Sequence, residues 1–324
     1  MSDMRYRTLG ESGLIVSAVG LGCNNLGRPG TRTESPEGTR AVVDAALDAG
    51  VTLFDVADIY GGPPGRSEEL LGQALGARRA DVVVATKFGM DMRGANGPDW
   101  GARGSRRYIR RAVRASLRRL GTDHIDLYQY HRPDGVTPVE ETLAALDELV
   151  TEGTVRYLGS SNFAGWQVVE ADFLARAADH VRFVSAQNHY NLLCRDVEAE
   201  LVPACESYRV GILPFFPLAS GLLTGKFRRD QPPAAGTRIG DRRPDAHANA
   251  DWDTIEALTG YGKERDLSLL DVAIGGLAAR PAVTSVIAGA TTPEQVTANA
   301  RAGQWEPSAA DLAALDDILA QPAT

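Results

Sequence analysis

Short apolar runs alternate with longer amphipathic stretches along this chain, and no other feature of the sequence limits its possible folds as strongly. The runs are rich in Val, Ile and Leu without regular polar alternation, which is typical of parallel strands buried on both faces. The stretches between them have apolar residues at helical spacing, as the crossover helices of a parallel sheet require. The predicted strands are residues 18–21, 51–54, 82–86, 125–129, 157–159, 183–187, 211–214 and 283–287.

Capping and stop residues mark the helices that fill the gaps. The first predicted helix, 36–49, follows Ser35 and precedes Gly50, so its start and stop signals agree. Residues 105–120 place Ile109 and Val113 on one face and end at Gly121. The remaining predicted helices are 138–152, 166–179, 196–208 and 267–280.

Eight strands with helices between them predict one α/β domain over residues 1–324, a (β/α)8 TIM barrel. Residues 1–17 precede it as a β-hairpin, because turn residues around Gly13 separate two apolar segments. A doubly wound open sheet is the alternative, but it favours a GxGxxG turn, and the segment after Gly20 lacks the third glycine. Residues 89–104 and 227–250 form extended loops on the C-terminal face, where barrel active sites are built.

Composition excludes several classes of function. A formal net charge of −8 and a pI near 5.3 disfavour nucleic-acid binding, which needs a basic surface. Three widely spaced cysteines form no disulfide framework and no CxxC pair, so we expect a reducing, cytoplasmic setting. The N-terminus lacks the apolar core of a signal peptide, and the longest weakly polar run, 210–223, is too short to cross a membrane.

Four polar side chains lie at the ends of successive predicted strands: Asp55, Tyr60, Lys87 and His131. The C-terminal ends of barrel strands converge on one rim, so we expect a common pocket. A free tyrosine has a pKa of about 10, and a neighbouring ammonium lowers it. An aspartate keeps that lysine charged, and a histidine can orient a carbonyl. The set suits proton donation to an oxyanion.

Each of these residues also has an ordinary structural explanation. Asp55 alone would more often cap a turn, Tyr60 would more often pack in a core, and Lys87 would often be a solvated charge. A single histidine is more often structural than catalytic. Only their joint occurrence at successive strand ends favours chemistry.

Longer motifs carry a resemblance to a known family. They are FDVADIYG (54–61) with GRSEELLG (65–72), DLYQYH (126–131), GSSNF (159–163), QN with YN (187–191), PLASG (217–221) with GK (225–226), and IAGA (287–290) with PEQV (293–296) and Asn299. In this order they resemble the aldo-keto reductase superfamily over nearly the whole chain, in particular the branch of bacterial NADP-dependent oxidoreductases and potassium-channel beta subunits. The resemblance implies a cytoplasmic reductase of a small-molecule carbonyl.

The resemblance also assigns roles by position. It makes Asp55, Tyr60, Lys87 and His131 the catalytic tetrad. It places NADPH, with NADH possible, on a set of residues that hold the nicotinamide, the pyrophosphate and the adenosine end. These residues are Ser161, Asn162, Gln187, Phe215, Pro217, Leu218, Ser220, Gly221, Leu223, Lys226, Gly289, Thr291, Thr292, Gln295 and Asn299.

Some positions depart from the family pattern. Thr291 and Thr292 stand where an arginine or lysine often binds the 2′-phosphate of NADP, which leaves Lys226 and Arg228 as substitutes. Cys23, like Asn24 beside it, and Trp100 are the expected substrate contacts. No metal site is expected, because the histidines lack partners at ligand spacing.

Two other functions stay open at this point. A lyase or aldolase barrel could use Lys87 as a Schiff-base nucleophile, which the fold alone does not exclude. A regulatory subunit could bind the cofactor as a redox sensor with little turnover. The nicotinamide-site motifs disfavour the lyase, and the complete tetrad disfavours the regulatory subunit.

Overall fold

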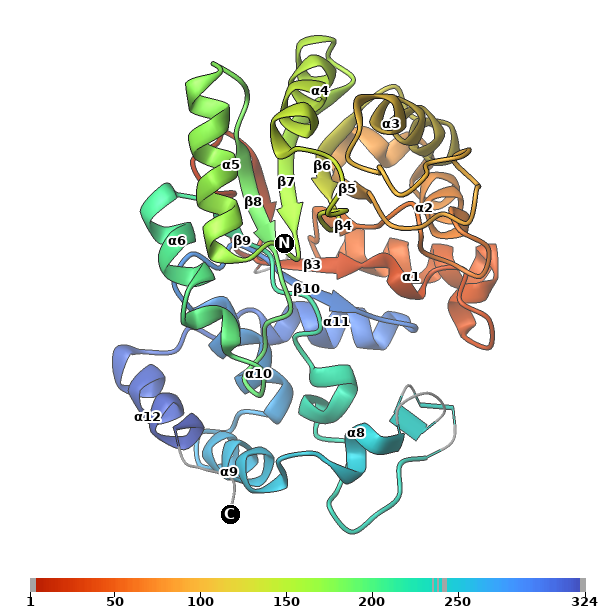
Figure 1. Ribbon diagram of the computed structural model, residues 1–324. Coiled ribbons are helices and arrows are strands. Elements are labelled where there is room, and N and C mark those ends of the chain that lie inside the picture. The colour runs from red at the N-terminus through yellow and green to blue at the C-terminus, as the bar shows by residue number, and fades with distance from the viewer. Residues whose placement is uncertain (1–3, 235, 238, 241–243, 321–324) are drawn as a thin grey trace.

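A computed structural model describes residues 4–234, 236–237, 239–240 and 244–320. Eight parallel strands lie at its centre in the order β10-β3-β4-β5-β6-β7-β8-β9 (Figure 1). Backbone bridges from Ile212 to Val283 and from Phe215 to Ile287 join the two outer strands, so the sheet closes into the predicted barrel. The strands are β3 (Val19–Gly22), β4 (Leu53–Asp55), β5 (Val83–Phe88), β6 (Ile125–Tyr130), β7 (Val155–Ser161), β8 (Phe183–Gln187), β9 (Gly211–Ile212) and β10 (Val286–Gly289).

Helices surround the barrel and add a layer at one end. Those that lie along the chain between strands or directly after β10 are α1 (Pro36–Asp48), α2 (Arg66–Leu75), α3 (Arg106–Leu120), α4 (Val139–Thr151), α5 (Gly165–Ala177), α6 (Leu201–Tyr208), α10 (Leu269–Ala278) and α11 (Pro293–Ala302). The others are α8 (Pro244–Ala248), α9 (Trp252–Lys263) and α12 (Ala309–Leu319), which Figure 1 shows gathered below the barrel. Short 3-10 helices are η1 (Cys23–Asn25), η2 (Arg32–Glu34), η3 (Gly76–Asp81), η4 (Asp196–Glu198) and η5 (Ala219–Thr224).

One predicted helix differs from the structure, and helices α2, α8, α9 and α12 were not predicted. The helix expected at 196–208 is divided into η4 and α6, which begins at Leu201. Pro203 explains the division, because proline lacks an amide hydrogen and is tolerated only in the first turn of a helix. The helix α2 was not predicted, although Leu70, Leu71 and Leu75 form its buried face.

The N-terminal hairpin closes one end of the barrel. Strand β1 (Tyr6–Thr8) pairs antiparallel with β2 (Ile15–Ser17), as predicted. Leu9 and Val16 are fully buried in one apolar cluster with strand residues such as Leu53 and Leu127. The hairpin therefore seals the end where the strands begin and leaves the other end available for a site.

The predicted loops lie at that other end. Residues 89–104 follow β5 and include Asn96, whose side chain is buried against Asp58. Of the second loop, 227–250, residues 235, 238 and 241–243 lie outside the described residues. A separate apolar cluster that includes Leu223, Leu258, Val272 and Leu315 joins η5 to α9, α10 and α12.

Replacing Leu9 with alanine tests the role of the hairpin. Because Leu9 is fully buried, Leu9→Ala should lower the free energy of unfolding by about 2–5 kcal/mol. Ile15 lies in the same hairpin but is 59% exposed, so Ile15→Ala is the matched control, with an expected change of about 0.5 kcal/mol or less. Urea unfolding measures both variants. Equal losses of unfolding free energy in the two variants would mean that the buried face of the hairpin does not stabilise the barrel.

Candidate active site

The structure brings the four predicted tetrad side chains together at the C-terminal rim. Asp55 ends β4, Lys87 lies near the end of β5, and His131 follows β6. The Lys87 ammonium donates to Asp55 Oδ2 at 2.7 Å and to the Val56 carbonyl at 2.9 Å. Its Nζ also lies 5.0 Å from the centre of the Tyr60 ring.

The lysine is fully buried and nevertheless charged. Burial alone would favour the neutral amine, but the Asp55 carboxylate and the Tyr60 side chain outweigh burial and raise the pKa of Lys87. Asp55 is fixed in turn by two amides, because Gln187 Nε2 donates to its Oδ1 at 2.7 Å and Gln129 Nε2 at 3.2 Å. The ion pair is thus held in place from the barrel interior.

The effect on Tyr60 differs from the expectation. Burial raises the pKa of Tyr60, and the opposing influence of the Lys87 ammonium does not overcome it. The sequence predicted a net lowering, because it shows the cation but not the depth of the phenol. A raised pKa keeps the hydroxyl protonated at neutral pH, which is the form that can donate a proton.

The fourth side chain, His131, is neutral. Burial, followed by the positive charges of Lys87 and Arg132, holds the pKa of His131 well below its usual range. The His131 ring lies edge-on to the Tyr60 ring, with centroids 5.9 Å apart and planes at 87°. Its Nδ1 is buried and finds no hydrogen-bond partner among the described residues. A neutral imidazole here can accept or donate a hydrogen bond to a bound molecule.

Three predicted nicotinamide contacts lie at neighbouring strand ends. Ser161 ends β7, and Asn162 follows it in a left-handed backbone conformation with φ 57°. The Asn162 amide donates to the His131 carbonyl and to Ser161 Oγ, both at 3.0 Å. Gln187 ends β8, but its amide nitrogen is committed to Asp55. The structure therefore gives Gln187 a supporting role that the sequence reasoning missed.

The segment after β9 carries the predicted stacking and pyrophosphate residues. Phe215 stacks on His189, with ring centroids 5.6 Å apart and planes at 11°. The loop from Pro217 to Lys226 includes η5, in which Ser220 and Gly221 have positive φ values of 62° and 113°. Non-glycine residues rarely adopt such φ values, and they tend to occur at functional sites.

Lys226 folds back over this loop. A Cβ atom added to Gly221 would lie 3.8 Å from the Lys226 ammonium, so the glycine leaves a small cradle beside the charge. Burial lowers the pKa of Lys226, and no carboxylate among the described residues lies within ion-pair distance of it. A partly buried ammonium without a counter-charge favours an anionic ligand.

The predicted adenosine end follows β10. Gly289 is exposed at the end of the strand, and Thr292 caps α11 by accepting from the Gln295 amide at 3.4 Å. The Thr291 amide and hydroxyl both donate to Gln295 Oε1, at 2.8 and 3.2 Å. Asn299 is buried in the helix. These polar groups bond mainly to one another, so this end presents hydroxyls and amides rather than a cation.

The structure buries Cys23, one of the two predicted substrate contacts. Its side chain is fully buried in the main core, and its thiol donates to the Leu21 carbonyl at 3.6 Å. Cys23 begins η1 and points inward, which the sequence could not show. Trp100 is 73% exposed and packs against the Arg107 guanidinium at 4.9 Å, on the surface of the loop after β5.

Gln129 is a site residue that sequence reasoning missed. It shares the inward face of β6 with Leu127, which is in the barrel interior, and is fully buried. The available signal was a polar residue at an inward position of an otherwise apolar strand, next to a strand that ends in Asp55.

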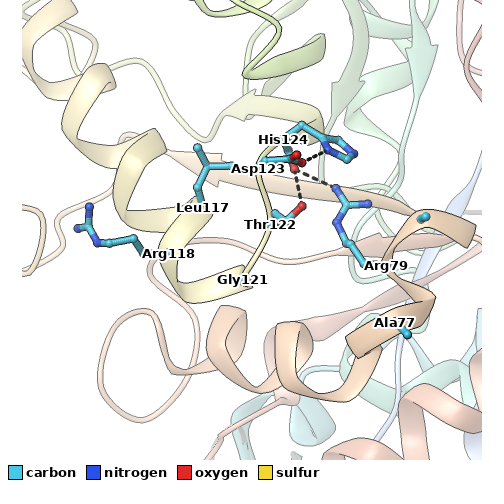
Figure 2. Close-up of a pocket in the computed structure, with 9 residues that line it drawn as sticks. Ala77, Arg79, Leu117, Arg118, Gly121, Thr122, Asp123 and His124 are labelled. Atoms are coloured by element: carbon cyan, nitrogen blue, oxygen red, sulfur yellow. Dashed lines mark hydrogen bonds and ion pairs between the residues drawn. The ribbon is translucent and has the colours of Figure 1, made fainter.

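A surface pocket elsewhere has no part in this site. Figure 2 shows Arg79, Asp123 and His124 on its wall, between η3 and the turn that follows α3. These residues precede β5 and β6, so the pocket lies at the end of the barrel opposite the tetrad. Arg79 donates to the His124 carbonyl at 3.0 Å and pairs with Asp126 at 2.7 Å.

Among the described residues, no group of three or more His, Cys, Asp or Glu is arranged to hold a metal ion. No described helix combines the length and apolar character needed to cross a membrane.

Known proteins resemble this chain over most of its length. A family model described as Aldo/keto reductase family matches residues 18–320. A probable voltage-gated potassium channel subunit beta from Oryza sativa subsp. japonica is 38% identical over 307 residues, covering 92% of this chain and 91% of the relative. L-glyceraldehyde 3-phosphate reductase from Escherichia coli (strain K12) is 34% identical over 330 residues, covering 98% and 93%. The uncharacterized oxidoreductase YrpG from Bacillus subtilis (strain 168) is 36% identical over 327 residues, covering 98% and 97%.

The ion pair of the site can be tested through stability. Asp55→Asn keeps the size of the side chain but leaves the Lys87 ammonium buried without its carboxylate, so it should cost about 3–5 kcal/mol of unfolding free energy. Glu256→Gln removes one partner of an exposed pair with Arg229 and should change stability by about 0.5 kcal/mol or less. Chemical denaturation compares the two variants, and an Asp55→Asn protein as stable as the control would contradict a charged Lys87.

Proposed function

Because the chain belongs to the aldo/keto reductase family, we propose that it is an NADPH-dependent carbonyl reductase in which Tyr60 is the general acid. The observation that carries the proposal is the placement of the Tyr60 ring beside the buried Lys87–Asp55 pair, with Lys87 Nζ 5.0 Å from the ring centre. It supplies a protonated phenol next to a fixed positive charge. Such a group suits a reaction in which negative charge develops on an oxygen.

The residues present fit a nicotinamide dinucleotide. The Lys226 ammonium suits a pyrophosphate, because no carboxylate among the described residues lies at ion-pair distance from it. The cradle at Gly221 lies beside that charge. The start of α11 adds backbone N–H groups of the kind that bind phosphate. The Ser161 and Asn162 side chains at the strand ends suit a carboxamide, and the Phe215 ring offers a face for stacking.

A reduced nicotinamide held by these residues would supply a hydride for the carbonyl carbon of the substrate. Tyr60 donates its hydroxyl proton to the carbonyl oxygen, so an alcohol forms and a phenolate stays behind. Lys87 stabilises that phenolate, and Asp55 keeps the ammonium charged and in position. Neutral His131 hydrogen-bonds the carbonyl oxygen and sets its angle to Tyr60. A solvent proton then restores the phenol.

The proposed substrate is a small aldehyde or ketone. Two relatives, L-glyceraldehyde 3-phosphate reductase and versiconal hemiacetal acetate reductase, are named as reductases of small molecules. We propose NADPH ahead of NADH on the family pattern, with Lys226 as the cation for the cofactor phosphates. Arg228 is a weaker candidate, since its guanidinium already bonds the Gly225 and Phe227 carbonyls. Three free cysteines agree with a reducing, cytoplasmic setting.

The site disfavours one of the two alternative functions, the Schiff-base lyase, more than the other, the regulatory subunit. A Schiff-base lyase needs a neutral lysine, whereas the pKa of Lys87 is raised and its ammonium donates to Asp55 and to the Val56 carbonyl. The regulatory alternative is a cofactor-binding subunit with little turnover. The similarity to probable potassium channel beta subunits from rice and Arabidopsis thaliana favours keeping it.

Tyr60→Phe tests the role of the phenol. Loss of the hydroxyl removes the general acid, so turnover of an aldehyde with NADPH should fall roughly 100- to 10,000-fold while cofactor binding is retained. Tyr6→Phe is the control, because Tyr6 is 49% exposed on the hairpin. Cofactor oxidation over a carbonyl library, with NADPH and NADH in parallel, measures turnover, and quenching of cofactor fluorescence measures binding.

Two results would count against the proposal. Equal turnover of Tyr60→Phe and the unaltered protein would exclude Tyr60 as the acid. Tight cofactor binding without single-turnover reduction of any aldehyde in the library would favour the regulatory subunit instead.

A further inference from the structure

A buried polar network lies on the outer side of the strand whose inner side carries Lys87. Ala85 of β5 belongs to the apolar cluster inside the barrel, so Lys87 shares its inward face and Thr86 between them points outward. The Thr86 hydroxyl donates to Glu68 Oε1 of α2 at 2.6 Å, and both side chains are fully buried. Polar side chains therefore lie directly behind the strand that holds the ammonium.

One guanidinium connects this network to the loop after β5. Arg119, near the end of α3, donates from Nε to Glu68 Oε2 at 2.6 Å and from a terminal nitrogen to Asn96 Oδ1 at 3.3 Å. The Asn96 amide nitrogen donates in turn to Asp58 Oδ2 at 3.1 Å. Asp58 is fully buried and lies two residues before Tyr60. The hydrogen bonds thus run without a break from β5 to the turn that carries the phenol.

The network also lies next to the backbone bonds on both sides of Tyr60. The Asp58 amide donates to the Lys87 carbonyl at 3.2 Å, and the Ser67 amide donates to the Tyr60 carbonyl at 3.1 Å. Ser67 directly precedes Glu68 in α2. The side chains of Asp58 and Glu68 therefore anchor the two segments whose backbone holds Tyr60 in place.

The charges of the network indicate which form Asp58 takes. The network contains two buried carboxyl groups, Asp58 and Glu68, and one guanidinium, Arg119, which pairs with Glu68. Asp58 Oδ2 accepts from a neutral amide, and Oδ1 has no hydrogen-bond partner among the described residues. A buried carboxylate without a counter-charge is costly, so the neutral acid is favoured. In agreement, burial and then the Glu68 charge raise the pKa of Asp58 well above its usual range.

We propose that Asp58 and Asn96 are positioning residues for Tyr60, because the hydrogen bond between their side chains couples the loop after β5 to the turn that carries the phenol. The inference rests on the proposed carbonyl reduction. Proton transfer from Tyr60 depends on its distance from the substrate oxygen, so a small displacement of the turn slows the reaction without weakening substrate binding. The loop and the general acid are held together by this bond.

Backbone hydrogen exchange tests the coupling without any turnover. The amides of Tyr60 and Ser67 are measured by NMR, because their hydrogen bonds open when the turn moves. Asp58→Leu removes the acceptor of the Asn96 amide and should speed both exchanges about 10-fold or more. Asp58→Asn keeps an acceptor oxygen in a side chain of the same shape. Since Asp58 is neutral, this variant should exchange within about threefold of the unaltered protein.

Two further variants separate positioning from stability. Asn96→Ala breaks the same hydrogen bond from the other side and should give the same acceleration, so it decides the question if Asp58→Leu does not fold. Asp126→Leu is the matched control, because Asp126 is 2% exposed and accepts from the Val84 amide at 3.0 Å near the start of β6, at the end of the barrel away from the tetrad. It should lower stability and leave local exchange at the turn unchanged.

Reduction kinetics provide a second readout. Asp58→Leu should lower kcat about 10-fold with KM within about twofold of the unaltered protein, and Asp58→Asn should restore most of kcat. Unchanged exchange in Asp58→Leu and Asn96→Ala, or equal acceleration in Asp126→Leu, would overturn the positioning role. An unaltered kcat in a variant with accelerated exchange would overturn it as well.

These outcomes differ from failure of the proposed function. The exchange rates do not depend on turnover, so they report the coupling whatever reaction the protein catalyses. If Tyr60→Phe reduces aldehydes as fast as the unaltered protein, the reductase mechanism fails even where the exchange rates change as expected.

Discussion

The buried pair of Lys87 and Asp55 is the interaction on which the rest of the site depends. A charge without solvent needs a counter-charge and further hydrogen bonds, and here Gln129, Gln187 and the Val56 carbonyl supply them. These groups come from strands β4, β5, β6 and β8 and from the segment directly after β4. Because a closed barrel holds its strands in fixed register, the ammonium beside the phenol is positioned before any ligand binds.

One end of the barrel contributes to stability, and the other end carries the polar groups of the site. The hairpin fills the end where the strands begin with apolar side chains, and the polar groups gather where the strands finish. Helices α9, α10 and α12 pack on η5 and support the loop that carries Lys226. The loop from Pro217 to Lys226 can therefore contain left-handed residues such as Ser220, because packing elsewhere offsets the energetic cost of their backbone conformation.

Sequence patterns were sufficient for the strands, the hairpin and the proximity of the tetrad, because strand ends in a barrel must converge. They did not reveal what depends on depth and direction. Cys23 and Trp100 were both expected to contact the substrate, yet the Cys23 side chain enters the core and Trp100 is 73% exposed. The raised pKa of Tyr60 and the commitment of Gln187 to Asp55 likewise depend on burial and side-chain orientation. Neither can be read from spacing.

The most direct test of the central claim is the protonation state of Lys87 in the folded protein. Nitrogen-detected NMR of the lysine side chains as a function of pH, with Lys87→Met to assign the signal, measures it. The account predicts that the ammonium keeps its proton beyond the ordinary lysine value of about 10.4. Loss of that proton near neutral pH would contradict the account, since the phenol would then have no cation beside it.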